Sequence, residues 1–182
     1  MPLVPVNATP TTEPGAESPA QVLAAYHAHQ GMTGRGNSAF TTAARSFLRR
    51  WPAVQAWAEE PLHVQLAANT ATHPFITFLL VTGRLHPDWE YLVHRKFSSL
   101  WRDLPGTVIG ADIEEFITAA RTVGYSERVA SAMASQVMAR ILFATGKRLH
   151  EVTHDDFDAL TVAGTARQQA TGRTWKHYRA AA

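Results

Sequence analysis

The sequence has no cysteine, and this absence excludes a disulfide scaffold, a thiolate metal site and a cysteine nucleophile. Charged residues are also few, 18% of 182, whereas 46% are apolar, a balance that is typical of a folded chain. Long apolar runs are missing: the strongest, at 74–81, is far shorter than the roughly 20 residues of a bilayer-spanning helix. We therefore expect a soluble globular protein of one domain or two small ones, with no membrane partner.

The first 20 residues contain no Lys or Arg and no continuous apolar core, so they lack the regions of a signal peptide, and a cytoplasmic location is expected. They hold five prolines among Thr, Ala and Glu, which predicts an extended or disordered tail. A short helix is expected at 20–29, broken by the glycines that come after it. The predicted division is a flexible tail at 1–34 and a helical domain at 35–182, whose folded body starts near Asn37.

Beyond the tail, apolar residues recur with a period near 3.6, which predicts helices. The first is capped by Asn37 or Ser38 and stops before Pro52. A second runs over 75–82, and a third opens near Pro87 and buries apolar residues as far as position 104.

Three further helices are predicted from their capping residues. Asp112 and Glu115 form a capping box for one helix. Ser126 caps the next, and Gly146 lies where a left-handed terminal residue belongs. Thr153, with an acid three positions later, begins the last. The stripe expected to be buried in the middle helix consists of Val129, Met133, Val137, Ile141 and Ala144. Because no segment alternates with a period of two, the predicted fold class is all-α, a compact multi-helix bundle.

The letters of residues 150–154 match the zinc-peptidase motif H-E-x-x-H. That chemistry requires both histidines on one helix face, but Gly146 ends the preceding helix and Thr153 begins the next. The third ligand of the extended motif is missing as well. We interpret the match as a coincidence and predict no metal and no cofactor, while a zinc hydrolase using His150 and His154 stays open as an alternative that a zinc assay would test.

Aromatic and basic residues bear on nucleic-acid binding. Trp51, Trp57, Trp89 and Trp101 are interpreted as core residues and not as a base-stacking platform. The formal charge is only +2, but Lys and Arg gather beside the predicted helices, where donors for phosphate are needed. For any single one of them a solvated helix face is an equally good interpretation. The candidate DNA-binding residues are Arg45, Arg49, Arg50, Arg95, Lys96, Lys147, Arg148, Arg173, Lys176 and Arg179.

A family resemblance supports this interpretation. Residues 126–157, a helix followed by a glycine turn, an apolar residue, an acid and Thr before an acidic cap, resemble the N-terminal core-binding part of tyrosine recombinases and phage-type integrases. The runs at 35–40, 47–52 and 97–102 are similar to the front end of the site-specific integrases of high-GC actinobacteria. The resemblance implies a bundle of the SAM-like core-binding type, with double-stranded DNA as partner and a catalytic recombinase domain or other protomers as further candidates.

The same resemblance implies that catalysis belongs to a separate C-terminal domain with two arginines, a His-x-x-Arg pair and a tyrosine nucleophile. None of the nine histidines here is followed by arginine at the third position, so no catalytic residue is assigned and no enzyme activity is expected of the chain alone. The stretch at 172–182 starts as a helix and stops in three alanines, which we interpret as an element cut off in its course. The alternatives are a helical interaction domain that does not bind DNA and a helix-turn-helix variant over 126–160, although its connection of six residues exceeds the usual three or four.

Overall fold

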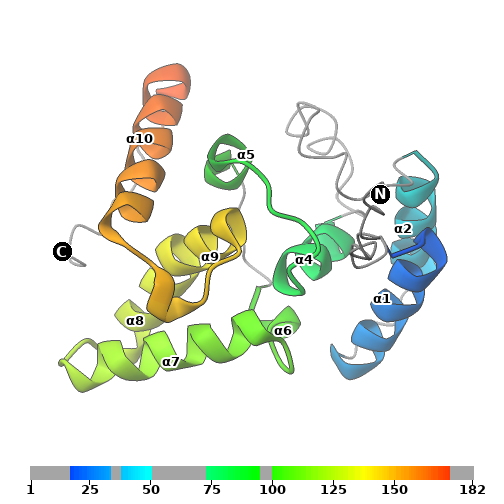
Figure 1. The fold of residues 1–182 in the computed structure, drawn as a ribbon, viewed down its shortest axis with the longest axis horizontal. Helices are drawn as coiled ribbons and strands as arrows, with labels where there is room; N and C mark the ends of the chain where they lie inside the picture. Colours follow the sequence, from blue (N-terminus) through cyan, green and yellow to red (C-terminus); the bar gives the residue numbers. More distant parts are fainter. Residues whose placement is uncertain (1–16, 34–37, 51–72, 95–99, 173–182) are drawn as a thin grey trace, which may run out of the picture.

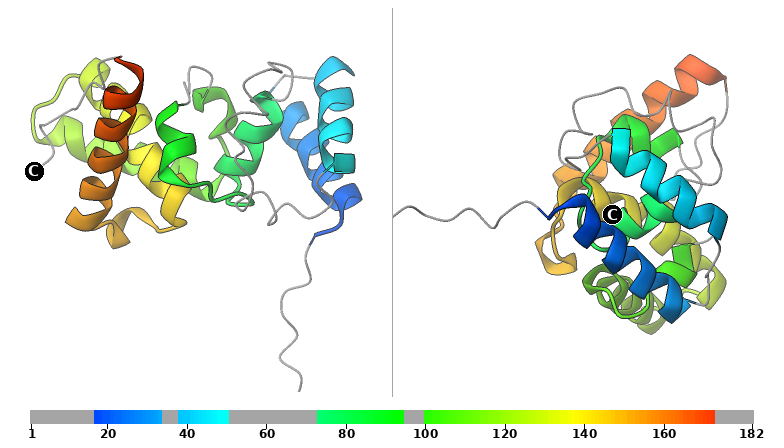
Figure 2. Two further views of the ribbon diagram at one scale, coloured as in Figure 1. Left: turned by 90° about the horizontal axis from the view of Figure 1, so that it is seen from above. Right: turned by 90° about the vertical axis from the view of Figure 1, so that its right-hand side faces the viewer.

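The computed structural model describes residues 17–33, 38–50, 73–94 and 100–172, and its regular elements are all helices, so the predicted all-α class is confirmed. Helices α1 (Pro19–Thr33) and α2 (Ser38–Arg50) lie together at one end of the molecule, and α4 (His73–Val81) lies near its middle (Figure 1, Figure 2). The remaining elements are α5 (Trp89–His94), α6 (Leu100–Asp103), α7 (Val108–Thr122), α8 (Glu127–Met133), the π-helical turn η3 (Ala134–Met138), α9 (Ala139–Thr145), the 3-10 turn η4 (Leu149–Glu151) and α10 (His154–Thr171).

Helix α4 forms the centre of the core because its residues from Phe75 to Val81 are all buried. Apolar residues all round a helix bury it on every side, instead of leaving one face to water, and the one polar residue of this run, Thr77, donates its hydroxyl to the His73 carbonyl. Around it, the rings of Tyr26 and Phe47 meet Phe75 edge-on, at centroid distances of 5.0 and 5.6 Å. These contacts join α1 and α2 to the core.

Helix α1 is longer than the sequence predicts and belongs to the folded body. It continues through Gly31 and buries Val22 and Tyr26, each only 1% exposed. At its far end His29 Nε2 lies 3.4 Å from Asp103 Oδ1 of α6, and both side chains are buried. Helix α1, on the tail side of the predicted boundary at 34–35, thus packs on the core, and the cost of about 1 kcal/mol for a glycine within a helix is outweighed by burial of this face. The remainder of the predicted tail, residues 1–16, lies outside the described residues.

Most capping predictions are confirmed. Ser126 Oγ accepts from the Val129 amide, and Thr153 forms the predicted capping box with Asp156. The box predicted at Asp112 and Glu115 is wrong. Helix α7 begins one turn earlier, at the cap Thr107, whose Oγ1 accepts from the Gly110 amide at 3.0 Å. A Cβ on Gly110 would collide with the Leu104 carbonyl, so glycine permits this tight entry into α7.

The buried stripe predicted along 129–144 is only partly correct. Val129 is 36% exposed, whereas Ala130, Met133, Ala134 and Met138 are buried. Within α8 the buried face is formed by Ala130 and Met133, which leaves Val129 at its edge. Downstream, the π turn η3 inserts one residue and rotates the residues of α9 by about 100° relative to an uninterrupted α-helix. A single 3.6-residue period therefore cannot describe both α8 and α9.

A second, smaller core joins α5, α9 and α10 through Val93, Ile141 and Leu160. Trp89 packs against it, in partial agreement with its predicted core position. The prediction for Trp101 is wrong, because this side chain on the short helix α6 is 40% exposed. Trp51 and Trp57 lie outside the described residues.

Candidate nucleic-acid interface

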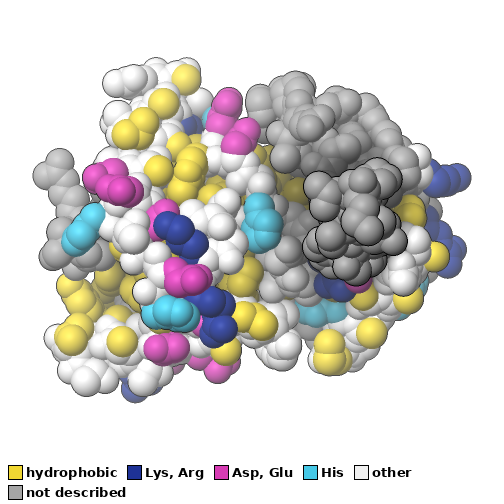
Figure 3. Space-filling view, in the orientation of Figure 1, with side chains coloured by type: hydrophobic (Ala, Val, Ile, Leu, Met, Phe, Trp, Pro, Cys, Tyr) yellow, Lys and Arg dark blue, Asp and Glu magenta, His cyan; other side chains and the backbone are white. Residues whose placement is uncertain are grey.

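Helix α2 presents a cationic face. Its apolar stripe buries Phe47 and Leu48, while Arg45 and Arg49, at the margin of that stripe beside Leu48, are exposed. The α2 sequence contains no acid, and Arg49 Nη2 donates to Ser46 Oγ of the same helix at 3.3 Å. Within the described ranges, neither Arg45 nor Arg49 forms an ion pair with a carboxylate. Figure 3 shows Lys and Arg side chains standing out at the edge of the molecule that carries α2.

A groove of about 710 Å³ runs between α1 and α2. Leu23 of α1 and Leu48 of α2 give it apolar surface, and Arg45 and Arg49 lie along its α2 side. The other lining residues are Pro19, Ala20 and Thr42. The groove therefore combines an apolar surface with two cations one helical turn apart.

The acid closest in sequence to this groove is held elsewhere. Glu17, just before α1, accepts hydrogen bonds from Arg84 Nε at 2.7 Å and Arg84 Nη2 at 2.9 Å. The hydrogen bonding from Arg84 lowers the pKa of Glu17, against the opposing effect of burial. Arg84, which follows the end of α4, thus compensates the negative charge of Glu17. Its guanidinium carbon also lies 5.2 Å from the centre of the Phe78 ring.

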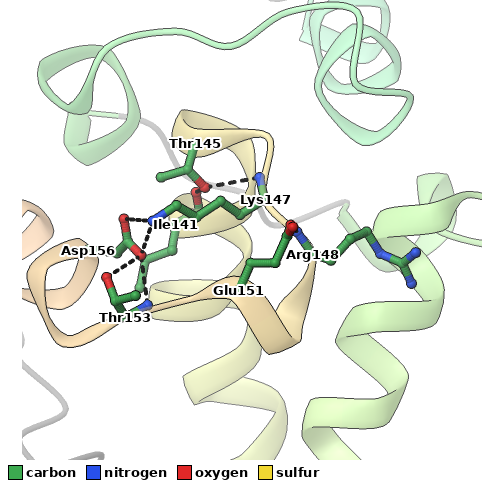
Figure 4. Close-up of polar contacts among 7 residues, drawn as sticks. All are labelled: Ile141, Thr145, Lys147, Arg148, Glu151, Thr153 and Asp156. Atoms are coloured by element: carbon green, nitrogen blue, oxygen red, sulfur yellow. Dashed lines mark hydrogen bonds and ion pairs between the residues drawn. The ribbon is translucent and has the colours of Figure 1, made fainter.

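The second group of predicted residues lies at the α9–α10 junction, where both cations form ion pairs within the protein. Lys147 Nζ donates to both oxygens of Asp156, at 2.7 and 2.9 Å (Figure 4). Arg148 donates through Nε and Nη2 to Asp112 of α7, with shortest distances of 2.8 and 2.7 Å. The amide of Leu149 adds a third donor to the same carboxylate.

These contacts set the protonation of both carboxyls. The hydrogen bonds from Arg148 lower the pKa of Asp112 despite its burial, with help from the Leu149 amide. Burial pushes the pKa of Asp156 upward, but the bonds from Lys147 and Thr153 together outweigh it and the pKa is lowered. Both acids are therefore charged at neutral pH and compensate the two cations.

A smaller cavity of about 380 Å³ lies beside this junction. His86, Lys147 and Arg148 line it together with the start of α7, but so does Asp112. His86 is fixed by its Nδ1, which lies 3.0 Å from the Phe143 carbonyl oxygen. In Figure 3 acidic and basic side chains alternate on this part of the surface, in contrast to the cationic face of α2.

The other predicted residues are not placed. Arg95, Lys96, Arg173, Lys176, Arg179 and the side chain of Arg50 lie outside the described residues. The structure thus brings Arg45 and Arg49 together on α2, and Lys147 and Arg148 together at the junction, as two separate groups.

The two histidines of the H-E-x-x-H match lie in different elements. His150 belongs to the 3-10 turn η4, and His154 is the first residue of α10, after the cap Thr153. They do not share a helix face, which is the arrangement that a zinc peptidase requires. In the part of the chain that the structure describes, no cluster of three or more His, Asp or Glu side chains could hold a metal ion.

Arg140 has a role that the sequence did not predict. It is only 3% exposed, and its guanidinium donates to three backbone carbonyls: Leu92 near the end of α5, and Ser135 and Gln136 in the π turn. Burial lowers the pKa of Arg140 to about 10, and the charge of Arg167 adds to this effect. The role of Arg140 is to donate hydrogen bonds to carbonyls at a helix end and in an irregular turn. The sequence signal that could have indicated this role is an arginine within an otherwise apolar run.

Comparison of the chain with protein-family models, with curated proteins and with solved structures gives no match. No helix in the described ranges is both long and apolar enough to cross a membrane. The function of the chain must therefore be inferred from its own residues.

Proposed function

We propose that the chain is a DNA-binding N-terminal module of a site-specific recombinase or integrase of the tyrosine-recombinase type, without strand-cleaving residues of its own. The observation that carries DNA binding is the acid-free cationic face of α2, where Arg45 and Arg49 are exposed and unpaired with any described carboxylate. Arginine at a helix surface offers several donors to phosphate, and release of counterions drives the association. The recombinase assignment is supported by the sequence resemblance, which covers roughly residues 35–179.

The distribution of charge along the chain favours α2 over the rest of the described surface. In residues 100–172 acids outnumber Lys and Arg, and Lys147 and Arg148 already face carboxylates. The acids of residues 100–172 would repel an approaching polyanion, whereas the charged residues of α2 are all cationic and would only attract it.

The experiment is a binding titration of the full chain with a fluorescent duplex of about two helical turns of random sequence at low salt. We expect saturable binding that weakens equally for all sequences when Arg45 and Arg49 are both replaced by glutamine. An Arg128→Gln variant, which removes an exposed cation of α8, is the matched control. Absence of binding by the unmodified chain would overturn the proposal, and strand cleavage by the chain alone would overturn the assignment of chemistry to a separate domain.

One observation favours a second candidate, a helical protein-interaction domain. The apolar surface that Leu23 and Leu48 give to the α1–α2 groove has no role in phosphate contact. Retention of a partner protein at high salt, without DNA binding at low salt, would favour this candidate.

A further inference from the structure

The α1–α2 groove combines two chemistries that a DNA backbone does not require together. Its surface is partly apolar, because it is lined by the half-buried Leu23 of α1 and by Leu48 of α2, which is 4% exposed. Its α2 side carries the guanidinium groups of Arg45 and Arg49. Phosphates need the cations, but an apolar groove of this volume fits a ligand that also brings an apolar side chain.

The charge of the groove is of one sign. Helix α1 contains no Lys, Arg, Asp or Glu, and α2 contains no acid. Glu17, beside the start of α1, is bound bidentately by Arg84. No described lining residue is acidic, so a ligand with carboxylates beside its apolar side chain is complementary to the groove.

We infer that this groove docks an acidic segment of a partner protein, with one apolar side chain seated over Leu23 and carboxylates paired with Arg45 and Arg49. The two arginines are four residues apart on α2, a separation of about 6 Å along one helix face. A helical segment with acids at the same spacing on either side of a Leu, Phe or Trp matches both features. Recognition of an amphipathic helix by a groove obeys the same pattern in other proteins.

The inference has a regulatory consequence that rests on the proposed function. If DNA phosphates and the acidic segment both pair with Arg45 and Arg49, the two ligands exclude one another. The apolar contact at Leu23 belongs to the protein segment alone, so Leu23 distinguishes the two binding events.

The experiment begins with a phage library of random 16-residue peptides selected on the full chain. The selected peptides are synthesised with a fluorophore and titrated against the unmodified chain, Leu23→Gln, Ala20→Glu, the double variant Arg45→Gln/Arg49→Gln, and the control Arg128→Gln. Ala20 is exposed and lines the groove, so Ala20→Glu adds a repelling carboxylate without disturbing the core. Thermal unfolding followed by circular dichroism identifies any variant that fails to fold.

We expect peptides with acids flanking an apolar residue. Their affinity should fall at least about tenfold in the three groove variants and stay unchanged in Arg128→Gln. Leu23→Gln should leave duplex affinity unchanged, and the peptide should displace the duplex. Peptides without acids, or binding that ignores both Leu23→Gln and Ala20→Glu, would overturn the docking site.

The remaining outcomes separate the two proposals. Peptide binding without any duplex binding would contradict the proposed function and leave the docking site standing. Duplex binding that the peptide does not displace would contradict mutual exclusion alone. Displacement that depends on the arginines but not on Leu23 would mean simple charge competition, and it would contradict the docking site.

Discussion

Arg148 and the buried carboxylate of Asp112, 36 positions apart in the sequence, form a bidentate ion pair that fastens the α9–α10 junction to α7. Asp112 is almost completely buried, whereas half of the Arg148 side chain is exposed. We interpret this pair as structural: Arg148 compensates the charge of a buried carboxylate, and its own charge is therefore less available to an external phosphate. It also separates Arg148 from the arginines of α2, although the sequence predicts a single set of DNA-binding residues that includes them all.

The Asp112→Asn substitution should lower the free energy of unfolding at pH 7 by about 2 kcal/mol, because a buried charge-assisted bond is lost. Since contact with Arg148 lowers the pKa of Asp112 in the folded state, its contribution is present above its unfolded pKa of about 4. It is lost as the pH falls through the lowered pKa, so the difference between the two proteins should shrink in acid.

Urea unfolding at pH 7 and at pH 3 measures both expectations. Asp158→Asn, at an exposed position of α10, is the control and should change the stability by less than about 0.5 kcal/mol. An Asp112→Asn effect that is equal at both pH values would contradict the role given to the ion pair.

Gly146→Ala should destabilise the protein more than Gly172→Ala. Both glycines end a helix with φ near +65°, a conformation that costs alanine about 1 kcal/mol. A Cβ at Gly146 would also lie 3.0 Å from Cε1 of His86, whereas the space at Gly172 is open. Thermal unfolding of both variants compares the two costs. If the extra cost at Gly146 comes from His86, then Gly146→Ala should cost less in a His86→Ala background, and a double-mutant cycle measures that difference. Equal losses of stability in Gly146→Ala and Gly172→Ala would contradict the contact with His86.

Arg140→Met should lower the free energy of unfolding by about 3 kcal/mol, because carbonyls of α5 and of the π turn would lose their donor in a buried site. Arg128→Met, which replaces an exposed arginine one element earlier, should have little effect. Chemical denaturation of both variants compares them directly. A loss below about 1 kcal/mol for Arg140→Met would mean that the π turn is stable without this side chain.

Lys147→Gln should leave duplex affinity within about twofold, since the Lys147 ammonium already faces Asp156 and the charge removed is largely compensated. Anisotropy titration at low salt, with correct folding checked by circular dichroism, measures this. A loss as large as that produced by a single substitution on α2 would place the α9–α10 junction in the interface.

Local signals account for the parts of the fold that were predicted correctly from the sequence. The caps Ser126 and Thr153 and the left-handed Gly146 depend on residues at most four positions away, and all three predictions are confirmed. The docking of α1 was missed because its buried contacts, such as His29 with Asp103, join residues 74 positions apart. The helix that contains the π turn could not be predicted from a single period.

The candidate site shows the same limit. In the sequence, nothing distinguishes the basic residues of the α9–α10 junction from those of α2. The difference comes from the fold, which places carboxylates beside Lys147 and Arg148 but not beside Arg45 or Arg49 among the described residues. The groove between α1 and α2 could not be predicted either, because the proline-rich and glycine-rich flanks of α1 indicated a tail.

The salt dependence of duplex binding tests the central claim, that the α2 face holds DNA, most directly. If Arg45 and Arg49 each neutralise one phosphate, the slope of log affinity against log salt should become less steep by about 1.8 in the Arg45→Gln/Arg49→Gln variant. The Arg128→Gln control should retain the original slope. An unmodified chain that does not bind in dilute buffer, or a double variant with an unaltered slope, would contradict the account.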